Sequence, residues 1–63
     1  MNIRDIRHRE GLTMKQVAEM SNVSEAAISL IERGKRIPNL QTAKNIADAL
    51  NVSLDELIKG VES

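Results

Sequence analysis

The sequence predicts an all-helical fold of five short helices, and three observations lead to this prediction. The chain contains no Phe, Tyr or Trp, it has a single proline, and its apolar residues recur at intervals of three and four. Strands favour aromatic and alternating apolar residues, whereas these spacings place apolar side chains on one face of a helix. Because 63 residues have room for only one core, we expect one domain over residues 1–63.

The composition limits how so small a domain can be stabilised. The chain has no cysteine and His8 is its only histidine, which excludes disulfides and a zinc site of soft ligands. We therefore expect no metal and no cofactor, and stability must come from helix ends, packing or self-association. No apolar run approaches the length of a membrane span, and the charged start lacks the apolar stretch of a signal peptide. These features predict a cytoplasmic protein without a membrane partner.

The ends of the first two helices are indicated by their side chains. A helix favours an acceptor side chain at its start, for the free amides, and a residue that tolerates a left-handed conformation after its end. Asn2 and Gly11 fit these positions for the first helix, and Thr13 and Asn22 fit them for the second. Gln16, three residues after Thr13, completes the pattern of a capping box.

The third and fourth helices carry the same signals. Ser24 caps the third helix and Gly34 closes it. Pro38 interrupts the chain, after which Asn39 caps the fourth helix and Asn51 ends it.

A short fifth helix completes the prediction. Ser53 and Glu56 form a second capping box, and Gly60 ends this helix. Apolar residues before three of the caps are placed to pack onto the first turn of the helix that follows: Leu12 on Val17, Val23 on Ile28 and Val52 on Leu57.

Residues 14–33 form the part of the chain that points to a function. They hold two short helices separated by about three residues, which is too tight for an antiparallel hairpin, so the helices must cross steeply. Ala18 is small enough for the crossing point, and Asn22 tolerates the positive φ of a sharp turn. A helix held in this way protrudes, so its first residues can reach base edges in the major groove.

Several short motifs in a fixed order carry a family resemblance: Gly11-Leu12-Thr13, Val17-Ala18, Asn22-Val23-Ser24, Ile28-Ser29, Ile31-Glu32-Arg33-Gly34-Lys35-Arg36 and Val52-Ser53-Leu54-Asp55-Glu56-Leu57. Over essentially its whole length the chain resembles the Cro and lambda-repressor-like (Xre) helix-turn-helix family. The resemblance implies a five-helix lambda-repressor-like domain that binds operator DNA, commonly as a homodimer on a palindrome. It also implies that the third helix reads the bases.

Matching positions give the site residues that the resemblance implies. Base-reading positions are Ser24, Glu25, Ala26, Ser29 and Leu30. Phosphate-contacting positions are Met14, Lys15, Arg33, Lys35, Arg36 and Asn39, some of them through backbone amides at the start of a helix. Arg7 and Glu32 match a structural ion pair of the family.

The chain departs from the family pattern at the reading positions. The family very often has glutamine at Met14 and glycine at Asn22. Glu25 can only accept a hydrogen bond, which suits a cytosine amino group, and Ala26 and Leu30 can contact only thymine methyls. Specificity is therefore expected to depend partly on DNA shape.

Some residues admit a second interpretation. The cations at the end of the third helix, Arg33, Lys35 and Arg36, would also be favoured there by the helix dipole, without any ligand. Leu30 would equally fit a core position beside its apolar neighbours. Ile58 and Val61 either complete the core or form an apolar edge that pairs with a second copy. His8 is expected on the surface and has no assigned role.

The net charge of the chain and its distribution bear on two possible functions. Nine basic and nine acidic side chains give no net charge, whereas nucleic-acid binders usually carry a positive excess. Residues 1–36 are nevertheless net basic, with seven basic and five acidic side chains, and residues 37–63 hold two and four. We expect a dimeric repressor that occupies double-stranded operator DNA. The alternative is a protein-binding module of the same fold that antagonises a second regulator protein. No pocket with a titratable cluster is indicated, so an enzyme is not expected.

Overall fold

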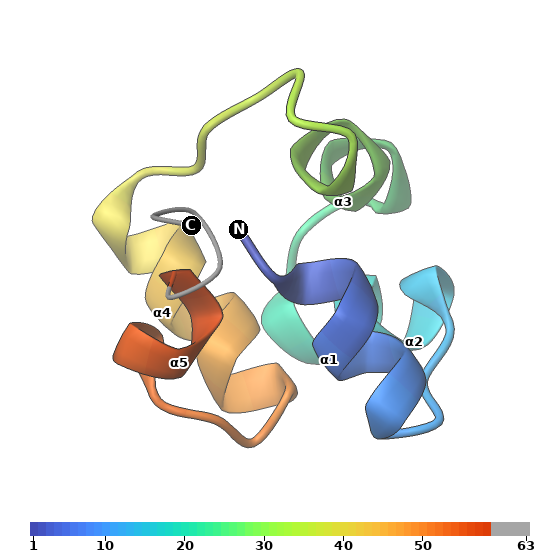
Figure 1. Cartoon of the computed structure of the whole chain (residues 1–63). Helices are drawn as coiled ribbons and strands as arrows, with labels where there is room; N and C mark the ends of the chain where they lie inside the picture. Colours follow the sequence, from blue (N-terminus) through green and yellow to red (C-terminus); the bar gives the residue numbers. More distant parts are fainter. Residues whose placement is uncertain (59–63) are drawn as a thin grey trace.

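The computed structural model describes residues 1–58, and this part of the chain contains five helices and no strand. The helices are α1 (Ile3–Arg9), α2 (Met14–Ser21), α3 (Glu25–Glu32), α4 (Leu40–Ala49) and α5 (Leu54–Ile58), as Figure 1 shows. The all-helical, five-helix prediction is confirmed, with each helix within a residue or two of its expected position.

One apolar core joins all five helices. Apolar side chains spaced three or four residues apart on each helix turn inward, as amphipathic helices require. α2 packs against both α3 and α4, and α4 packs against α5. The core consists of Ile3, Ile6, Val17, Ala18, Ile28, Ile31, Ile46, Ala47, Leu50 and Leu57. Leu12, Val23 and Val52, which precede three of the caps, pack against this core.

Four of the five predicted side-chain caps are present, at Thr13, Ser24, Asn39 and Ser53. The hydroxyl of Thr13 accepts a hydrogen bond from the Gln16 amide at 3.0 Å, and the Gln16 side chain accepts one from the Thr13 amide at 2.8 Å. Ser24 and Asn39 accept the corresponding amide bonds in α3 and α4, at 3.1 and 2.8 Å. Each cap of this kind contributes about 1 kcal/mol to stability. The start of α2 is therefore fixed by two reciprocal bonds, and the starts of α3 and α4 by one each.

Two predicted side-chain roles at helix ends are wrong. Asn2 precedes α1, but its side chain makes no cap bond, and its backbone amide instead donates to the Leu57 carbonyl at 2.9 Å. Ser53 caps α5, but the Glu56 carboxylate does not complete the box, because it accepts a bond from Arg9 at 2.8 Å. This bond raises the pKa of the Arg9 guanidinium. Only at Glu56 does a side chain bond a partner from the other end of the chain in place of the local bond. The predicted end at Gly60 lies outside the described residues.

The turns use the residues that tolerate a left-handed backbone. Asn22 ends α2 with φ of 58°, and Asn51 follows α4 with φ of 59°. Gly11 and Gly34 have φ of 70° and 73°. A residue with a branched side chain at these four positions would be strained, since the left-handed region costs roughly 1–2 kcal/mol for most residues. The turns that set the directions of α2, α3 and α4 are thus built into the sequence.

Candidate nucleic-acid interface

The α2–α3 junction is the tight turn that the sequence predicts. The Val23 amide donates to the Ala18 carbonyl at 3.0 Å, which folds the chain back at Asn22. Ala18 is buried beneath this turn. In Figure 1, α3 is viewed almost along its axis while α2 runs across the page, so the two helices cross at a large angle. The junction makes α3 project away from α2. A helix must project in this way if it is to enter the major groove of DNA.

Ser21 is a structural residue that sequence reasoning missed. It is the one buried polar residue among the described ones, and its hydroxyl donates to the Val17 carbonyl at 2.6 Å. A serine bond to the carbonyl four residues earlier satisfies a buried hydroxyl within the helix itself. No signal in the sequence distinguishes Ser21 from an exposed serine, because the burial comes from helices packed around it.

One face of α3, called here the free face, is left open or partly open by the other residues that the structure describes, 1–58. Ser24, Glu25 and Ala26 are exposed, and Ser29 and Leu30 are half-buried. The opposite face, with Ala27, Ile28 and Ile31, is buried. Five expected base-reading residues therefore share a single exposed or partly exposed face at helical spacing. Leu30 is intermediate between its two interpretations, since part of its side chain packs and part remains accessible.

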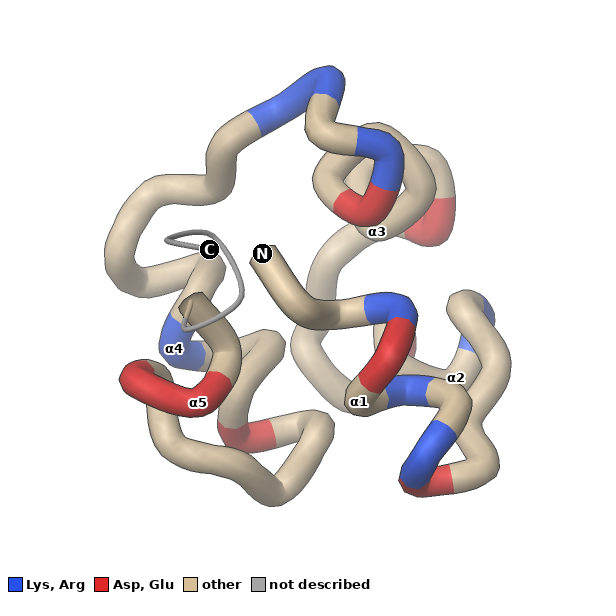
Figure 2. The backbone as a smooth tube through the Cα atoms, in the orientation of Figure 1, with Lys and Arg blue, Asp and Glu red and all other residues tan. Residues whose placement is uncertain are grey.

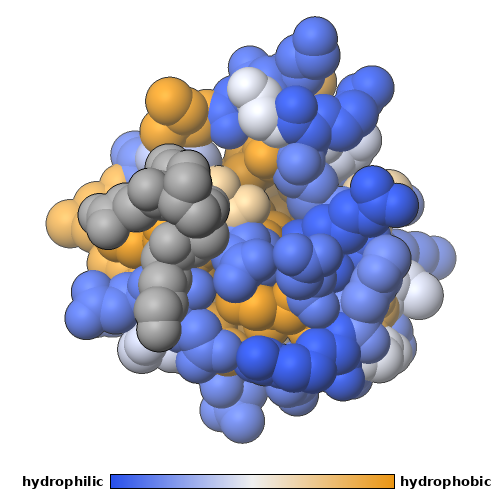
Figure 3. Space-filling view, viewed as in Figure 1, coloured by the Kyte–Doolittle hydropathy of each residue, from blue (hydrophilic) through white to orange (hydrophobic). Residues whose placement is uncertain are grey.

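Five of the six expected phosphate-contacting residues, four cations and one asparagine, lie on the surface. Lys15, Arg33, Lys35, Arg36 and Asn39 are all exposed. Figure 2 shows basic positions on α1, at the end of α3 and in the loop that follows, with acidic positions also on α1 and α3, whereas α5 carries acidic ones alone. In the same view, the side that α1 and α3 form is mostly hydrophilic, and apolar side chains gather over the loop before α4 (Figure 3). The charge asymmetry of the sequence thus becomes a spatial one.

Met14 lies at the start of α2, where a phosphate contact is expected, but its side chain is apolar. It is half-buried and packs against the core at the start of α2. The Gln16 amide is already used by the Thr13 cap. The amides of Met14 and Lys15, at the first two positions of the helix, have no acceptor within it. An anion beside α2 would therefore meet backbone donors at Met14 rather than a side chain.

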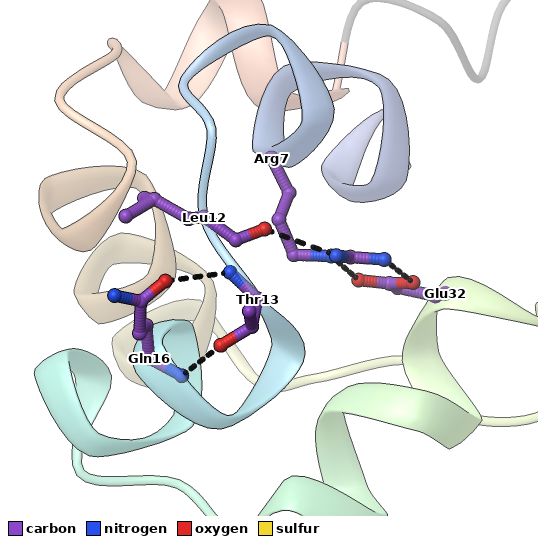
Figure 4. A network of polar contacts seen from close by, with 5 residues as sticks. All are labelled: Arg7, Leu12, Thr13, Gln16 and Glu32. Atoms are coloured by element: carbon purple, nitrogen blue, oxygen red, sulfur yellow. Dashed lines mark hydrogen bonds and ion pairs between the residues drawn. The ribbon is translucent and has the colours of Figure 1, made fainter.

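Arg7 and Glu32 tie α1 to the end of α3 (Figure 4). Arg7 Nε and Nη2 donate to the two Glu32 carboxylate oxygens at 2.7 and 3.2 Å, and Arg7 Nη1 donates to the Leu12 carbonyl at 3.1 Å. Their side chains are only 11% and 6% exposed. A bidentate pair of this kind fixes orientation as well as adding energy. The implied pair is present, and its Leu12 partner, which joins it to the Thr13 cap, was not predicted.

Two hollows of the described residues lie beside the expected reading positions of α3. One, of about 440 Å³, lies at the α2–α3 junction, and its ionisable lining residues are Lys15, Glu19 and Glu25. Two carboxylates and one ammonium group do not favour an anion there. The other, of about 260 Å³, lies between α1 and α3 and brings in Arg4 and His8, to which the sequence analysis assigned no site. Of these two hollows, the second carries the excess of basic groups.

Within residues 1–58, no three His, Cys, Asp or Glu side chains are grouped as metal ligands would be. No helix in the same range has the length and apolar character needed to cross a bilayer.

Comparison with known proteins agrees with this geometry. A family model described as Helix-turn-helix matches residues 3–57. The chain is 32% identical over 60 residues to the HTH-type transcriptional regulator DdrOP3 of Deinococcus deserti. The matched residues make up 95% of this chain and 46% of DdrOP3. It is 40% identical over 60 residues to the HTH-type transcriptional activator BcrR of Enterococcus faecalis, which covers 95% of this chain and 29% of that protein.

A third relative, the HTH-type transcriptional repressor RghR of Bacillus subtilis, is 42% identical over 57 residues, which is 89% of this chain and 42% of RghR. The chain thus spans less than half the length of each of these three relatives. Their names describe an activator and a repressor, and none describes an enzyme. The match over residues 3–57 and the five helices agree, and the chain belongs to the lambda-repressor-like (Xre) helix-turn-helix family of DNA-binding transcriptional regulators.

Proposed function

We propose that this chain binds operator DNA sequence-specifically as a homodimer, with α3 in the major groove, and represses transcription by occupying a promoter. The observation that supports this most strongly is the free face of α3: the five expected base-reading residues lie together, and the chain's own described residues leave them accessible. Exposed cations lie at both ends of this region, at Lys15 and at Arg33 to Arg36. In DNA-binding proteins generally, contacts to phosphates position the protein on the duplex and contacts to base edges give specificity. The cations would take the first role and α3 the second.

Selection of bound fragments from random-sequence duplex DNA tests this proposal. We expect enrichment of a palindrome whose half-sites are spaced by about one helical turn, 10–10.5 base pairs. If three or four cations per subunit neutralise phosphates, the log–log dependence of affinity on salt should have a slope of roughly −5 to −7 for a dimer. A slope near zero, or no enrichment, would contradict DNA binding. Capture of a second regulator protein by a chain that binds no DNA would favour the protein-binding alternative.

Variants of Arg36 and Glu25 should separate affinity from specificity. Arg36→Ala is expected to weaken binding to all duplexes alike and to make the salt slope smaller by about 1 per subunit, because it removes a phosphate contact. Glu25→Gln is expected to change which base pair is preferred at one position of each half-site, because an amide both donates and accepts. The measurement is a repeat selection with each variant. An unchanged preference for Glu25→Gln would mean that Glu25 does not read a base.

The apolar surface beside α4 supports a second copy of the chain as the partner. Ile37 is 90% exposed, Leu40 is 73% exposed and Ile58 is 40% exposed. Ile37 and Ile58 also line an apolar crevice of about 260 Å³ together with Met1 and Pro38. Large apolar side chains that gather in this way on one face are typical of an interaction surface. Ile58, one of the two residues of the dimer edge that the sequence suggests, lines this crevice together with Ile37. Val61, the other residue, lies outside the described residues.

Leu40→Lys is expected to reduce dimerisation, because it places a charge where an apolar side chain would be buried against the second copy. Sedimentation velocity at increasing protein concentration measures the effect. The matched control is Met20→Lys, which puts the same charge at an exposed apolar residue of α2. Equal dimerisation of the two variants would exclude the Leu40 surface as the interface.

A further inference from the structure

The loop after α3 and the first half of α4, residues 33–44, form a surface that we call the loop–α4 surface. Its two large apolar side chains are more exposed than any other among the described residues: Ile37 is 90% exposed and Leu40 is 73% exposed. Figure 3 shows apolar atoms gathered over this loop, next to hydrophilic ones. Apolar side chains that lie together on the outside of a small domain are typical of an interaction surface.

An apolar crevice of about 260 Å³ opens on the same surface. Its apolar lining consists of Met1, Ile31, Ile37, Pro38 and Ile58. Ile31 belongs to the core and is 5% exposed, so the crevice reaches down to the core. Gly34 also lines it, and a Cβ at Gly34 would meet no atom within 4 Å, so the crevice is open on that side. A crevice of this kind has room for one large apolar side chain of a partner, as an interface pocket holds an anchor residue.

The charge of the loop–α4 surface has one sign. Residues 33–47 contain four basic side chains and no acidic one, and Figure 2 shows no acidic position along the loop between α3 and α4. Lys35, Arg36 and Lys44 are exposed, and none of them forms an ion pair with another residue of the range 1–58. Arg36 lines the crevice, and Lys44 lies one helical turn after Leu40 on the same face of α4. The exposed apolar residues therefore lie among cations whose charge the described chain does not balance.

This combination selects among the partners of the surface. A DNA phosphate pairs with the cations but offers nothing to Ile37 or Leu40. A second copy in a symmetric dimer covers the apolar residues, but it presents the same cations again and does not neutralise them. A protein segment with both carboxylates and apolar side chains complements both features, and complementary charge of this kind favours the correct partner.

We propose that the loop–α4 surface binds an acidic segment of another protein, which inserts an apolar side chain into the crevice and places carboxylates against Arg36, Lys35 and Lys44. A guanidinium group binds a carboxylate through the same paired hydrogen bonds as a phosphate. An Arg36 bound in this way is no longer available to the duplex, and Ile37 and Leu40 are no longer available to a second copy. The segment thus acts as an antagonist of DNA binding, a consequence that rests on the proposed function.

Selection of short peptides from a random library displayed on phage, with the full chain as the bait, tests the inference. We expect the enriched peptides to combine several Asp or Glu residues with at least one large apolar residue. One enriched peptide is then synthesised with a fluorescent label, and its affinity is measured by anisotropy. Ile37→Ser should weaken binding of this peptide by about tenfold or more, because it removes apolar area that the peptide buries. Lys44→Gln should weaken it by about threefold, since an ion pair at the rim of an interface contributes little.

Two variants of α2 are the matched controls. Met20→Ser and Lys15→Gln make the same changes at an exposed apolar residue and an exposed cation of another helix. Both should bind the peptide as the wild type does. All four substituted residues are exposed, and circular dichroism confirms that the fold is kept. The absence of enriched peptides, enrichment of peptides without acidic residues, or equal affinity of Ile37→Ser and Met20→Ser would overturn the inference.

A competition experiment tests the antagonism. The unlabelled peptide, titrated into the chain bound to a labelled operator, should release the DNA. A peptide that binds the loop–α4 surface and leaves the operator bound would contradict the antagonism. A wild type that binds the peptide but no duplex would contradict the proposed function and still support the surface. Vesicles of phosphatidylglycerol distinguish a protein from a membrane: binding to vesicles that Ile37→Ser abolishes, without any enriched peptide, would assign the surface to lipid and overturn the inference.

Discussion

Glu32→Ala is expected to lower the free energy of unfolding by about 3 kcal/mol or more, because it leaves the Arg7 guanidinium largely buried without its carboxylate. A single core of this size seldom supplies more than about 3 to 5 kcal/mol, so the variant should be substantially unfolded at room temperature. Urea denaturation followed by circular dichroism measures the loss. Such a loss would mean that the Arg7–Glu32 ion pair is a main determinant of how α3 is oriented relative to α1.

The exposed pair of Arg9 and Glu56 supplies the control. Glu56→Ala breaks an ion pair of similar length on the surface, and its stability should equal that of the wild type within error. The double variant Arg7→Met with Glu32→Leu removes both buried charges and should regain much of the stability that Glu32→Ala loses. Equal stability of Glu32→Ala and Glu56→Ala would show that the buried pair does not orient α3.

Ala26→Glu is expected to reduce affinity for DNA by about a hundredfold or more without loss of fold. Ala26 lies exposed on the free face of α3, next to Glu25, and a second carboxylate there would face phosphates and base edges. Like charges held together in an interface cost several kcal/mol. Alanine and glutamate are both good helix formers, so α3 itself should persist. Fluorescence anisotropy with a labelled operator measures the affinity.

The control for Ala26→Glu is Met20→Glu, which changes the net charge by the same amount at an exposed residue of α2. Its affinity should fall far less, because Met20 lies outside the free face of α3. If both variants lose affinity equally, the effect is one of overall charge, and the assignment of α3 to the groove is wrong.

Helix ends and turns were predictable because their partners lie close in the sequence. Thr13 and Gln16 are three residues apart, and the left-handed turn at Asn22 depends on that residue alone. The inward residues of each helix follow from spacings of three and four. For the same reason the shared face of Glu25, Ala26 and Ser29 could be predicted before the fold was known.

Features that depend on packing between helices were not predictable. The Glu56 carboxylate has a local partner in the sequence pattern but bonds Arg9 instead, and the Asn2 backbone amide bonds the Leu57 carbonyl, a contact that no local pattern indicates. The α1–α3 hollow is lined by residues of helices that are far apart in the sequence, the Arg7–Glu32 pair among them, so nothing in the local sequence marks Arg4. The pair itself could be inferred only from the family resemblance.

If the free face of α3 lies against duplex DNA, a titration of the ¹⁵N-labelled chain with a selected operator should show it residue by residue. Amide resonances of residues 24–30 should shift most, followed by those of residues 14–15 and 35–39, while α5 stays nearly unchanged. Shifts confined to α4 and α5, with residues 24–30 unaffected, would contradict the account.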